Sequence, residues 1–186
     1  MNRPLPESLR PADLEHFVGQ PHLRAQIQAL LDAPHLPSLL LFGPPGCGKS
    51  TLALLLARAT GKKMLRLSAP EAGIQQLRRQ LAGVEILVLD ELHRFSKAQQ
   101  DFFLPLVENG SLTLLATTTE NPSFAVTRQL LSRLTVLRMR PLGQDELLTL
   151  AKRGAEEMKA DISGEVLKML AELSRGDASA LLNLVE

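Results

Sequence analysis

Five short runs along this chain are composed mostly of apolar residues, at positions 38–42, 64–67, 85–89, 112–117 and 135–139. Short apolar runs bounded by turn residues are typical of strands buried within a sheet. The segments between the runs carry apolar residues at helical spacing. Five short strands alternating with helices predict an α/β protein with a parallel sheet and helices on both faces.

Helical spacing is clearest in Leu23, Ile27, Leu30 and Leu31, and Pro21 is expected at the first position of that helix. Further helices are expected at residues 51–59, 74–81, 97–108 and 127–133. Ser96 is a suitable N-cap for the third of these, and a proline inside it, Pro105, is expected to bend its last turn.

The two ends of the chain depart from this alternation. Residues 1–20 are rich in proline and polar groups, which predicts an extended lead-in that lies on the folded surface. Beyond Pro141 only helical periodicity remains. We therefore expect an α/β domain over residues 1–141 and a small helical lid subdomain over residues 142–186.

Composition limits the class of protein. The chain has 186 residues and a formal net charge of +1, so charge gives no sign of nucleic-acid binding. It has no tryptophan or tyrosine, which leaves few side chains for a base-stacking platform. A single cysteine, Cys47, and a start unlike a signal peptide favour a cytoplasmic protein, and no apolar run reaches membrane-spanning length.

The segment Gly43-Pro44-Pro45-Gly46-Cys47-Gly48-Lys49-Ser50 fits the phosphate-binding pattern G-x-x-x-x-G-K-[ST] and lies between a predicted strand and a predicted helix. Glycines let backbone N–H groups close around phosphate oxygens, and Lys49 can reach the terminal phosphates. The Ser50 hydroxyl is a ligand for Mg²⁺, and Thr51 follows in the first helical turn, where unpaired N–H groups favour anions. Residues 43–51 therefore predict a P-loop nucleotide site for ATP and Mg²⁺.

Two acids end the third apolar run. Asp90 is expected to hold Mg²⁺, through water, and Glu91 to polarise the water that attacks the terminal phosphate. A threonine run enters a turn after the fourth strand, and residues 114–121 could orient that water or form a plain turn. Arg133 follows a short predicted helix and could stabilise transition-state charge in a neighbouring subunit. The four histidines lack metal-ligand spacing, so no other metal is expected.

These motifs in this order resemble the AAA+ ATPases, particularly their clamp-loader clade. More narrowly, DELHRFSKAQQD at residues 90–101, TTENPSF at 118–124 and LLSR at 130–133 resemble the replication-associated recombination protein A family, whose eukaryotic relative is the Werner helicase-interacting protein. The resemblance covers nearly the whole chain. It implies a DNA-dependent ATPase at stalled or damaged replication forks, which acts as a homo-oligomer on junctions or single-strand/duplex boundaries, with replication or repair proteins such as single-strand-binding protein as partners and a cytoplasmic, nucleoid-associated location.

The same resemblance assigns roles to individual residues. It matches a lead-in that holds adenine to Arg10, Pro11, Val18, Gly19 and Gln20. Thr119 matches a sensor of the γ-phosphate, with Thr118 as a competitor for that role. Arg133 matches an arginine finger supplied in trans, and Ser68 matches a polar switch that restrains the catalytic glutamate.

The chain departs from the family pattern in three places. The family's Gly-Asp-Ala-Arg becomes Gly176-Asp177-Ala178-Ser179, so a lid arginine that senses nucleotide is replaced by serine. The spacing between residues 68 and 86 is short for the family, and the chain stops after residue 186, where the family continues into an oligomerisation region. We therefore expect an ATPase core that binds ATP well and hydrolyses it slowly.

Two other functions fit parts of the sequence. Ser179 favours an ATP-binding switch or structural subunit of a clamp-loader-like assembly, whereas Lys49, Asp90, Glu91 and Arg133 together favour an enzyme. A Holliday-junction branch-migration motor has a similar threonine strand, but residues 93–95 fit it poorly.

Overall fold

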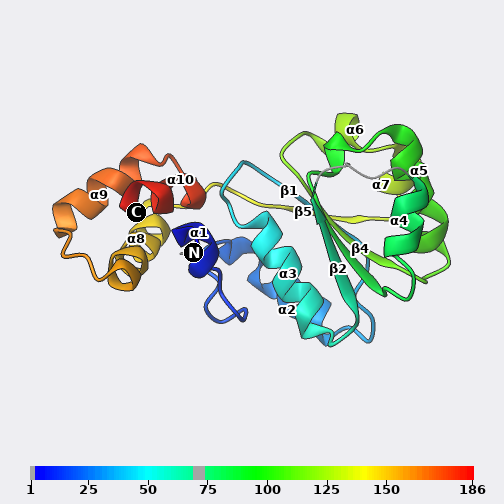
Figure 1. The fold of residues 1–186 in the computed structure, drawn as a ribbon, viewed down its shortest axis with the longest axis horizontal. Helices are drawn as coiled ribbons and strands as arrows, with labels where there is room; N and C mark the ends of the chain where they lie inside the picture. Colours follow the sequence, from blue (N-terminus) through cyan, green and yellow to red (C-terminus); the bar gives the residue numbers. More distant parts are fainter. Residues whose placement is uncertain (1–2, 69–73) are drawn as a thin grey trace.

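Five parallel strands form one sheet in the computed structural model, which describes residues 3–68 and 74–186. The sheet has the order β2-β3-β4-β1-β5 (Figure 1). Its strands are β1 (Leu39–Phe42), β2 (Met64–Ser68), β3 (Ile86–Asp90), β4 (Thr113–Thr118) and β5 (Thr135–Arg138). The predicted α/β fold with a five-stranded parallel sheet is confirmed, and each strand boundary lies within one residue of its predicted place.

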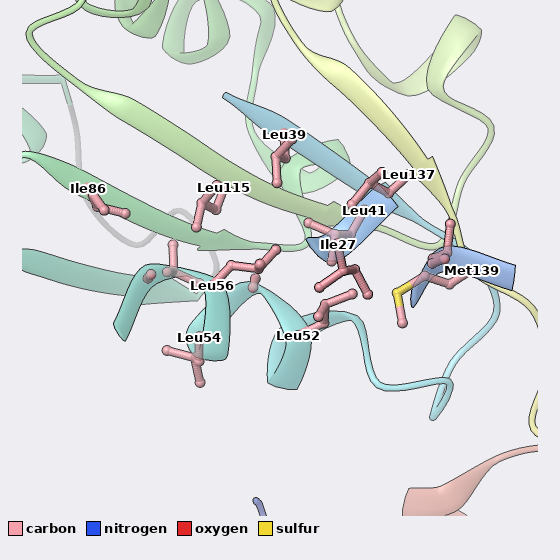
Figure 2. Close-up of a cluster of buried hydrophobic side chains, with 14 of the residues drawn as sticks. Ile27, Leu39, Leu41, Leu52, Leu54, Leu56, Ile86, Leu115, Leu137 and Met139 are labelled. Carbon is pink, nitrogen blue, oxygen red and sulfur yellow. The ribbon is translucent and has the colours of Figure 1, made fainter. Parts of the chain in front are cut away.

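One face of the sheet is covered by α2 (Arg24–Asp32) and α3 (Lys49–Ala59) (Figure 1). A one-turn 3₁₀ helix, η1 (Pro21–Leu23), precedes α2. Figure 2 shows Leu52 and Leu56 of α3 pointing toward Leu115 of β4 and its neighbours on the sheet. Burying these leucines holds α3, and with it the phosphate loop, in a fixed place against β1.

The other face is covered by α4 (Ile74–Gln80), α5 (Lys97–Glu108) and α7 (Arg128–Leu131). Ser96 caps α5 in a capping box with Gln99, as the sequence predicts. Two one-turn helices lie between these elements, η2 (Leu92–Arg94) after β3 and α6 (Pro122–Ala125) after β4. Side chains from alternate positions of the strands fill this second core, for example Leu40, Leu87 and Leu114.

Three helices follow β5, namely α8 (Gln144–Met158), α9 (Gly164–Leu173) and α10 (Ala178–Val185). They share a separate apolar core that includes Leu147, Leu167 and Leu181. Figure 1 shows this cluster beside the sheet, joined to it by the segment that leaves β5. Its interpretation as a nucleotide lid stays a prediction.

The predicted extended lead-in is wrong for its first part, because residues Leu5–Ser8 form a one-turn helix, α1. Leu5 is buried against the core of the three C-terminal helices, and its N–H donates to the Glu186 carboxylate over 3.2 Å. The apolar surface of these helices therefore orders a segment whose composition suggests no helix. Across the part of the chain that the structure describes, no helix is both long enough and apolar enough to span a membrane.

Candidate functional site

The phosphate loop, residues 43–48, joins β1 to α3. Gly46 and Gly48 have φ values of 63° and 94°, a region that residues with a Cβ rarely adopt. Gly48 occupies the N-cap position of α3, where no described side chain caps the helix. The first N–H groups of α3 therefore remain available to an anion at this end of the helix.

A cavity of about 360 Å³ opens over this loop, and its volume suits a small organic ligand. It brings together most of the predicted site residues: Arg10, Pro11, Val18, Pro45, Gly46, Cys47, Gly48, Lys49, Ser50, Thr51, Glu91 and Thr119. Eight predicted residues are not among those that line it: Gly19, Gln20, Gly43, Pro44, Ser68, Asp90, Thr118 and Arg133. Lead-in, phosphate loop, β3 and β4 thus converge on one cavity, although they are far apart in sequence.

Lys49 is held inside the loop. Its Nζ donates to the carbonyl oxygens of Gly43 over 2.9 Å and Pro44 over 2.7 Å, and the residue is 6% exposed. Neutral carbonyls leave the positive charge of the ammonium group uncompensated. The ammonium group is therefore ready to interact with an anion at the loop.

Gln20 does not line the cavity but contacts the phosphate loop, and its match to the lead-in that holds adenine stays a prediction. Its side-chain amide donates to the carbonyl oxygens of Cys47 and Arg140 over 3.2 and 2.7 Å and accepts from the N–H of Arg140 over 2.8 Å. The residue is 2% exposed, and its backbone is in the left-handed region, with a φ of 56°. In this arrangement Gln20 ties the phosphate loop to the chain that follows β5.

Asp90 lies behind the cavity at the end of β3. Arg66 of β2 donates two hydrogen bonds to its Oδ2, and the Thr117 hydroxyl donates to its Oδ1 over 3.2 Å. A hydroxyl and a carboxylate carry the kind of oxygen atoms that Mg²⁺ prefers, so Ser50 and Asp90 could hold this ion. Both Asp90 oxygens already accept hydrogen bonds, which fits ligation of the ion through water rather than directly.

Glu91 lines the cavity, and its backbone has a left-handed conformation, with a φ of 58° that is unusual for a residue other than glycine. Its N–H donates to the Thr117 hydroxyl over 3.2 Å, and its Oε2 lies 3.2 Å from Nε2 of His93. Sequence reasoning considered His93 as a metal ligand and as part of the family motif at residues 90–101, and it did not predict this contact. The i, i+2 spacing of Glu91 and His93 across a turn was the one available signal.

The three consecutive threonines at the end of β4 and just beyond it contact different partners. Thr117 contacts Asp90 and the Glu91 backbone, Thr118 contacts Nδ1 of His93 over 3.1 Å, and Thr119 lines the cavity. The sequence left Thr118 and Thr119 open as γ-phosphate sensors. Of the two, Thr119 is the one that borders the cavity.

Arg133 lies away from the cavity of its own chain. Its Nε and Nη2 each lie 3.0 Å from Oε1 of Glu108 at the end of α5, and the side chain is half-exposed. A surface ion pair of this kind contributes little to stability. The Arg133 guanidinium is therefore free to exchange Glu108 for another anion at small cost.

The C-terminal helices contact the phosphate loop at the start of α10. The N–H of Ala178 donates to the carbonyl oxygen of Gly46 over 3.1 Å, and the Asp177 carboxylate lies where a Cβ on Gly46 would project. Ser179, which replaces the lid arginine of the family pattern, lines the cavity. Arg153 of α8 also lines it, a residue that sequence reasoning missed because helical spacing alone does not orient α8.

Burial changes the titration of two cavity residues. Desolvation, and then the nearby Arg66 guanidinium, lower the pKa of Arg10, whose Nε has no hydrogen-bond partner among the described residues. Desolvation raises the pKa of the Cys47 thiol more strongly than the nearby Lys49 lowers it. Cys47 is therefore a buried, protonated thiol at neutral pH.

The parallel sheet, the glycine-rich loop that caps α3 and the acids at the end of β3 together define a P-loop nucleotide-binding protein of the AAA+ class. Within that class the chain belongs to the family of the Holliday junction DNA helicase RuvB P-loop domain, whose model matches residues 9–140. The predicted membership of the AAA+ ATPases is thereby confirmed.

Relatives of known name agree with the narrower resemblance. The chain is 36% identical to replication-associated recombination protein A of Escherichia coli K12 over 203 residues, covering 99% of the chain and 45% of that protein. It is 37% identical to ATPase WRNIP1 of Dictyostelium discoideum over 201 residues, covering 98% of the chain and 23% of that protein. The chain thus spans less than half the length of both relatives.

Solved structures agree on the fold. The Thermotoga maritima RuvB Holliday junction branch migration motor matches with a TM-score of 0.86 and 29% identity, over 95% of this chain and 64% of that one. Domain III of the Thermotoga maritima replication initiation protein DnaA matches with a TM-score of 0.73 at 16% identity, covering 93% of this chain and 85% of that one, which bears on the fold alone.

Proposed function

We propose that this protein is a Mg²⁺-dependent ATPase whose hydrolysis of ATP to ADP and phosphate is coupled to DNA at stalled or damaged replication forks. The observation that carries the proposal is the single cavity lined by Lys49, Ser50, Glu91 and Thr119. An ammonium group that can bind phosphates, a hydroxyl that can bind the metal and a carboxylate that can activate water therefore border the same cavity. Phosphoryl transfer requires this combination of positioning and charge stabilisation.

In this mechanism the N–H groups of residues 46–51 and the Lys49 ammonium bind the phosphates, so that Nζ exchanges its carbonyl partners for phosphate oxygens. Glu91 accepts a proton from the attacking water, and Thr119 orients that water beside the γ-phosphate. Ser50 and, through water, Asp90 would hold Mg²⁺, which would supply positive charge to the phosphate oxygens when bound. The lead-in residues Arg10, Pro11 and Val18 border the adenine side, and residues 142–186 act as the lid.

The DNA target and the assembly are inferred from the relatives. Two of them are named for replication-associated recombination and for Holliday-junction branch migration, so forks and junctions are the structures to test. Arg133 is exposed and lies outside its own cavity, which supports its use as an arginine finger in the site of a second copy. We therefore propose a homo-oligomer with shared sites that acts with replication or repair proteins such as single-strand-binding protein.

ATP turnover tests this proposal when it is measured without DNA, with single strands, with a forked duplex and with a four-way junction. The expected result is Mg²⁺-dependent turnover that rises with forked DNA. A larger rise with the four-way junction identifies a RuvB-like motor, in keeping with the family model. No turnover under any condition overturns the ATPase proposal.

Mixing two inactive variants tests the shared site. Lys49→Ala lacks the phosphate-binding cation and Arg133→Ala lacks the finger, so each alone is expected to be inactive. A mixed oligomer contains sites with an intact Lys49 and an Arg133 from the neighbour, and turnover should return. Arg79→Ala, which removes an exposed arginine of α4, is the matched control. Failure of the mixture to recover any turnover contradicts a finger supplied in trans.

A second candidate is an ATP-binding switch with little turnover. Ser179 lines the cavity at the position of the lid arginine, so no guanidinium reaches the nucleotide from the start of α10. Loss of one such charge can slow hydrolysis by orders of magnitude without loss of binding. Tight ATP binding with negligible turnover, and recovery of turnover in Ser179→Arg, would favour the switch over the motor.

A further inference from the structure

We propose that His93 is a positioning residue that fixes the direction of the Glu91 carboxylate by linking it to the end of β4. The proposal rests on the proposed ATPase function, since it concerns the group that activates water. The role differs from the one that the family resemblance gives to Ser68, which is to restrain the catalytic glutamate rather than to orient it.

His93, on η2, lies between two hydrogen-bonding partners, Glu91 and Thr118. Its Nε2 is 3.2 Å from Oε2 of Glu91, and its Nδ1 is 3.1 Å from the hydroxyl of Thr118. The His93 side chain is 14% exposed, and Thr118 is fully buried. A second carboxylate, that of Glu120, lies 3.9 Å from the same Nε2 and is largely exposed. Both ring nitrogens are therefore committed, and the ring bridges β4 to Glu91.

The partners determine which ring nitrogen carries the proton in the neutral imidazole. A carboxylate can only accept, so Nε2 must carry the hydrogen that points toward Glu91. Nδ1 is then an acceptor and takes the hydroxyl hydrogen of Thr118. The Thr118 hydroxyl has one hydrogen to donate, and Nδ1 of His93 at 3.1 Å is nearer than its other possible acceptor, the Glu120 carbonyl at 3.5 Å. The hydroxyl oxygen itself accepts the N–H of Glu120 over 3.1 Å.

This bridge leaves one Glu91 oxygen for chemistry. His93 occupies Oε2, and the left-handed backbone of Glu91 is held by its N–H bond to Thr117. Two consecutive threonines of β4 thus fix the two ends of Glu91, one directly and the other through His93. Oε1 remains to accept the proton of the attacking water, which is how an oriented general base works.

Ser68 does not have this relationship to Glu91 among the described residues. It pairs with Asp90 in the β2–β3 register, one residue before the catalytic acid. The partner of the Glu91 carboxylate that the structure describes is His93. The Glu91 carboxylate is therefore linked to β4 through His93.

Substitutions of His93 that keep or remove a hydrogen-bond donor at the place of Nε2 distinguish a role in positioning Glu91 from a role in packing. The amide nitrogen of Gln reaches the place of Nε2, whereas that of Asn reaches only the place of Nδ1. We expect kcat to fall about 10- to 100-fold in His93→Ala and His93→Asn, and much less in His93→Gln. The Kd for a fluorescent ATP analogue should change less than about twofold in all three. His35→Ala, which removes an exposed histidine, is the control with unchanged turnover.

The proton position can be read without nucleotide. Long-range ¹H–¹⁵N spectra of the histidine-labelled, nucleotide-free protein should show His93 with its hydrogen on Nε2, assigned by the loss of its signals in His93→Gln. Glu91→Gln should move these signals and leave those of His35 unchanged. A hydrogen on Nδ1 overturns the bridge.

The outcomes distinguish this inference from the proposed function. Turnover in the parent chain together with parent-like kcat in His93→Ala overturns the role of His93 alone. A kcat that rises in His93→Ala overturns it as well, since the contact would then restrain Glu91 rather than orient it. Absence of turnover in the parent chain overturns the ATPase proposal and this inference with it.

Discussion

The guanidinium group of Arg66 donates two hydrogen bonds to one oxygen of Asp90, from Nε over 2.9 Å and from Nη2 over 2.8 Å. The Asp90 side chain is 8% exposed and that of Arg66 is 39% exposed. A buried carboxylate is costly unless it is paired. Arg66 therefore supplies the positive partner of this buried carboxylate at the end of β3, where the metal is proposed to bind.

Replacing Arg66 with Met leaves the Asp90 charge without its cation. We expect the free energy of unfolding to fall by about 1–3 kcal/mol, less than for a fully buried pair because Arg66 is partly exposed. Mg²⁺ with ATP should then raise the melting temperature more in Arg66→Met than in the parent, because the ion replaces the lost charge. Urea denaturation and thermal scans measure both effects, with Arg79→Met as the control. An unchanged unfolding free energy contradicts this account of the pair.

Lys49→Ala removes the ammonium group from the phosphate loop. Saturable ATP binding should be lost, because no other described side chain places an ammonium group in the cavity. Calorimetric titration with ATP and Mg²⁺ measures the affinity, and Lys62→Ala, which removes an exposed lysine beyond α3, should bind like the parent. Unchanged affinity in Lys49→Ala refutes the assignment.

The strands and the phosphate loop follow from local patterns, and both were predictable. Leu39, Leu40 and Leu41 form an apolar run that predicts a buried strand, and all three are buried. The phosphate loop is predictable because its motif is one continuous segment with fixed positions for glycine, lysine and serine. The contacts of Arg66 with Asp90, of His93 with Thr118 and of Gln20 with Arg140 were not predictable, because each depends on which strand lies beside which. Asp90 meets Arg66 only because β2 pairs with β3, and Gln20 reaches Arg140 because β5 is next to β1. Helix α1 depends in the same way on the C-terminal helices that bury Leu5.

Gln20→Ala tests the tie between the phosphate loop and the end of β5. It leaves the carbonyl groups of Cys47 and Arg140 and the N–H of Arg140 without their amide partner. We expect a loss of about 1–3 kcal/mol in unfolding free energy and a weaker affinity for ATP, because the loop is less fixed. Urea denaturation and ATP titration measure these quantities, with Gln129→Ala at an exposed position as the control. Parent-like stability would show that water replaces the tie without cost.

The thiol of Cys47 should react slowly with a maleimide in the folded protein. Burial raises its pKa, so at a pH between the ordinary thiol value and the raised one it is a thiol in the fold and a thiolate in the unfolded chain. The rate should therefore rise with pH, with a midpoint above that of the denatured protein, and should be at least about tenfold slower near pH 7.5. Mass spectrometry follows the reaction. The labelled protein should no longer bind ATP, and full binding would place the thiol outside the nucleotide space.

Asp177 combines two roles that substitution can separate. Its carboxylate caps α10 by accepting the N–H of Ala180 over 2.9 Å, and it lies against Gly46 of the phosphate loop. Asp177→Asn keeps an oxygen for the cap and removes the charge, so ATP affinity should rise by about 3- to 10-fold with little loss of stability. Asp177→Ala removes both and should also lower the unfolding free energy by about 1 kcal/mol. ATP titration and urea denaturation of the two variants measure these effects. If affinity stays at the parent value in Asp177→Asn, the carboxylate does not repel the phosphates, and the contact of α10 with the loop acts through packing alone.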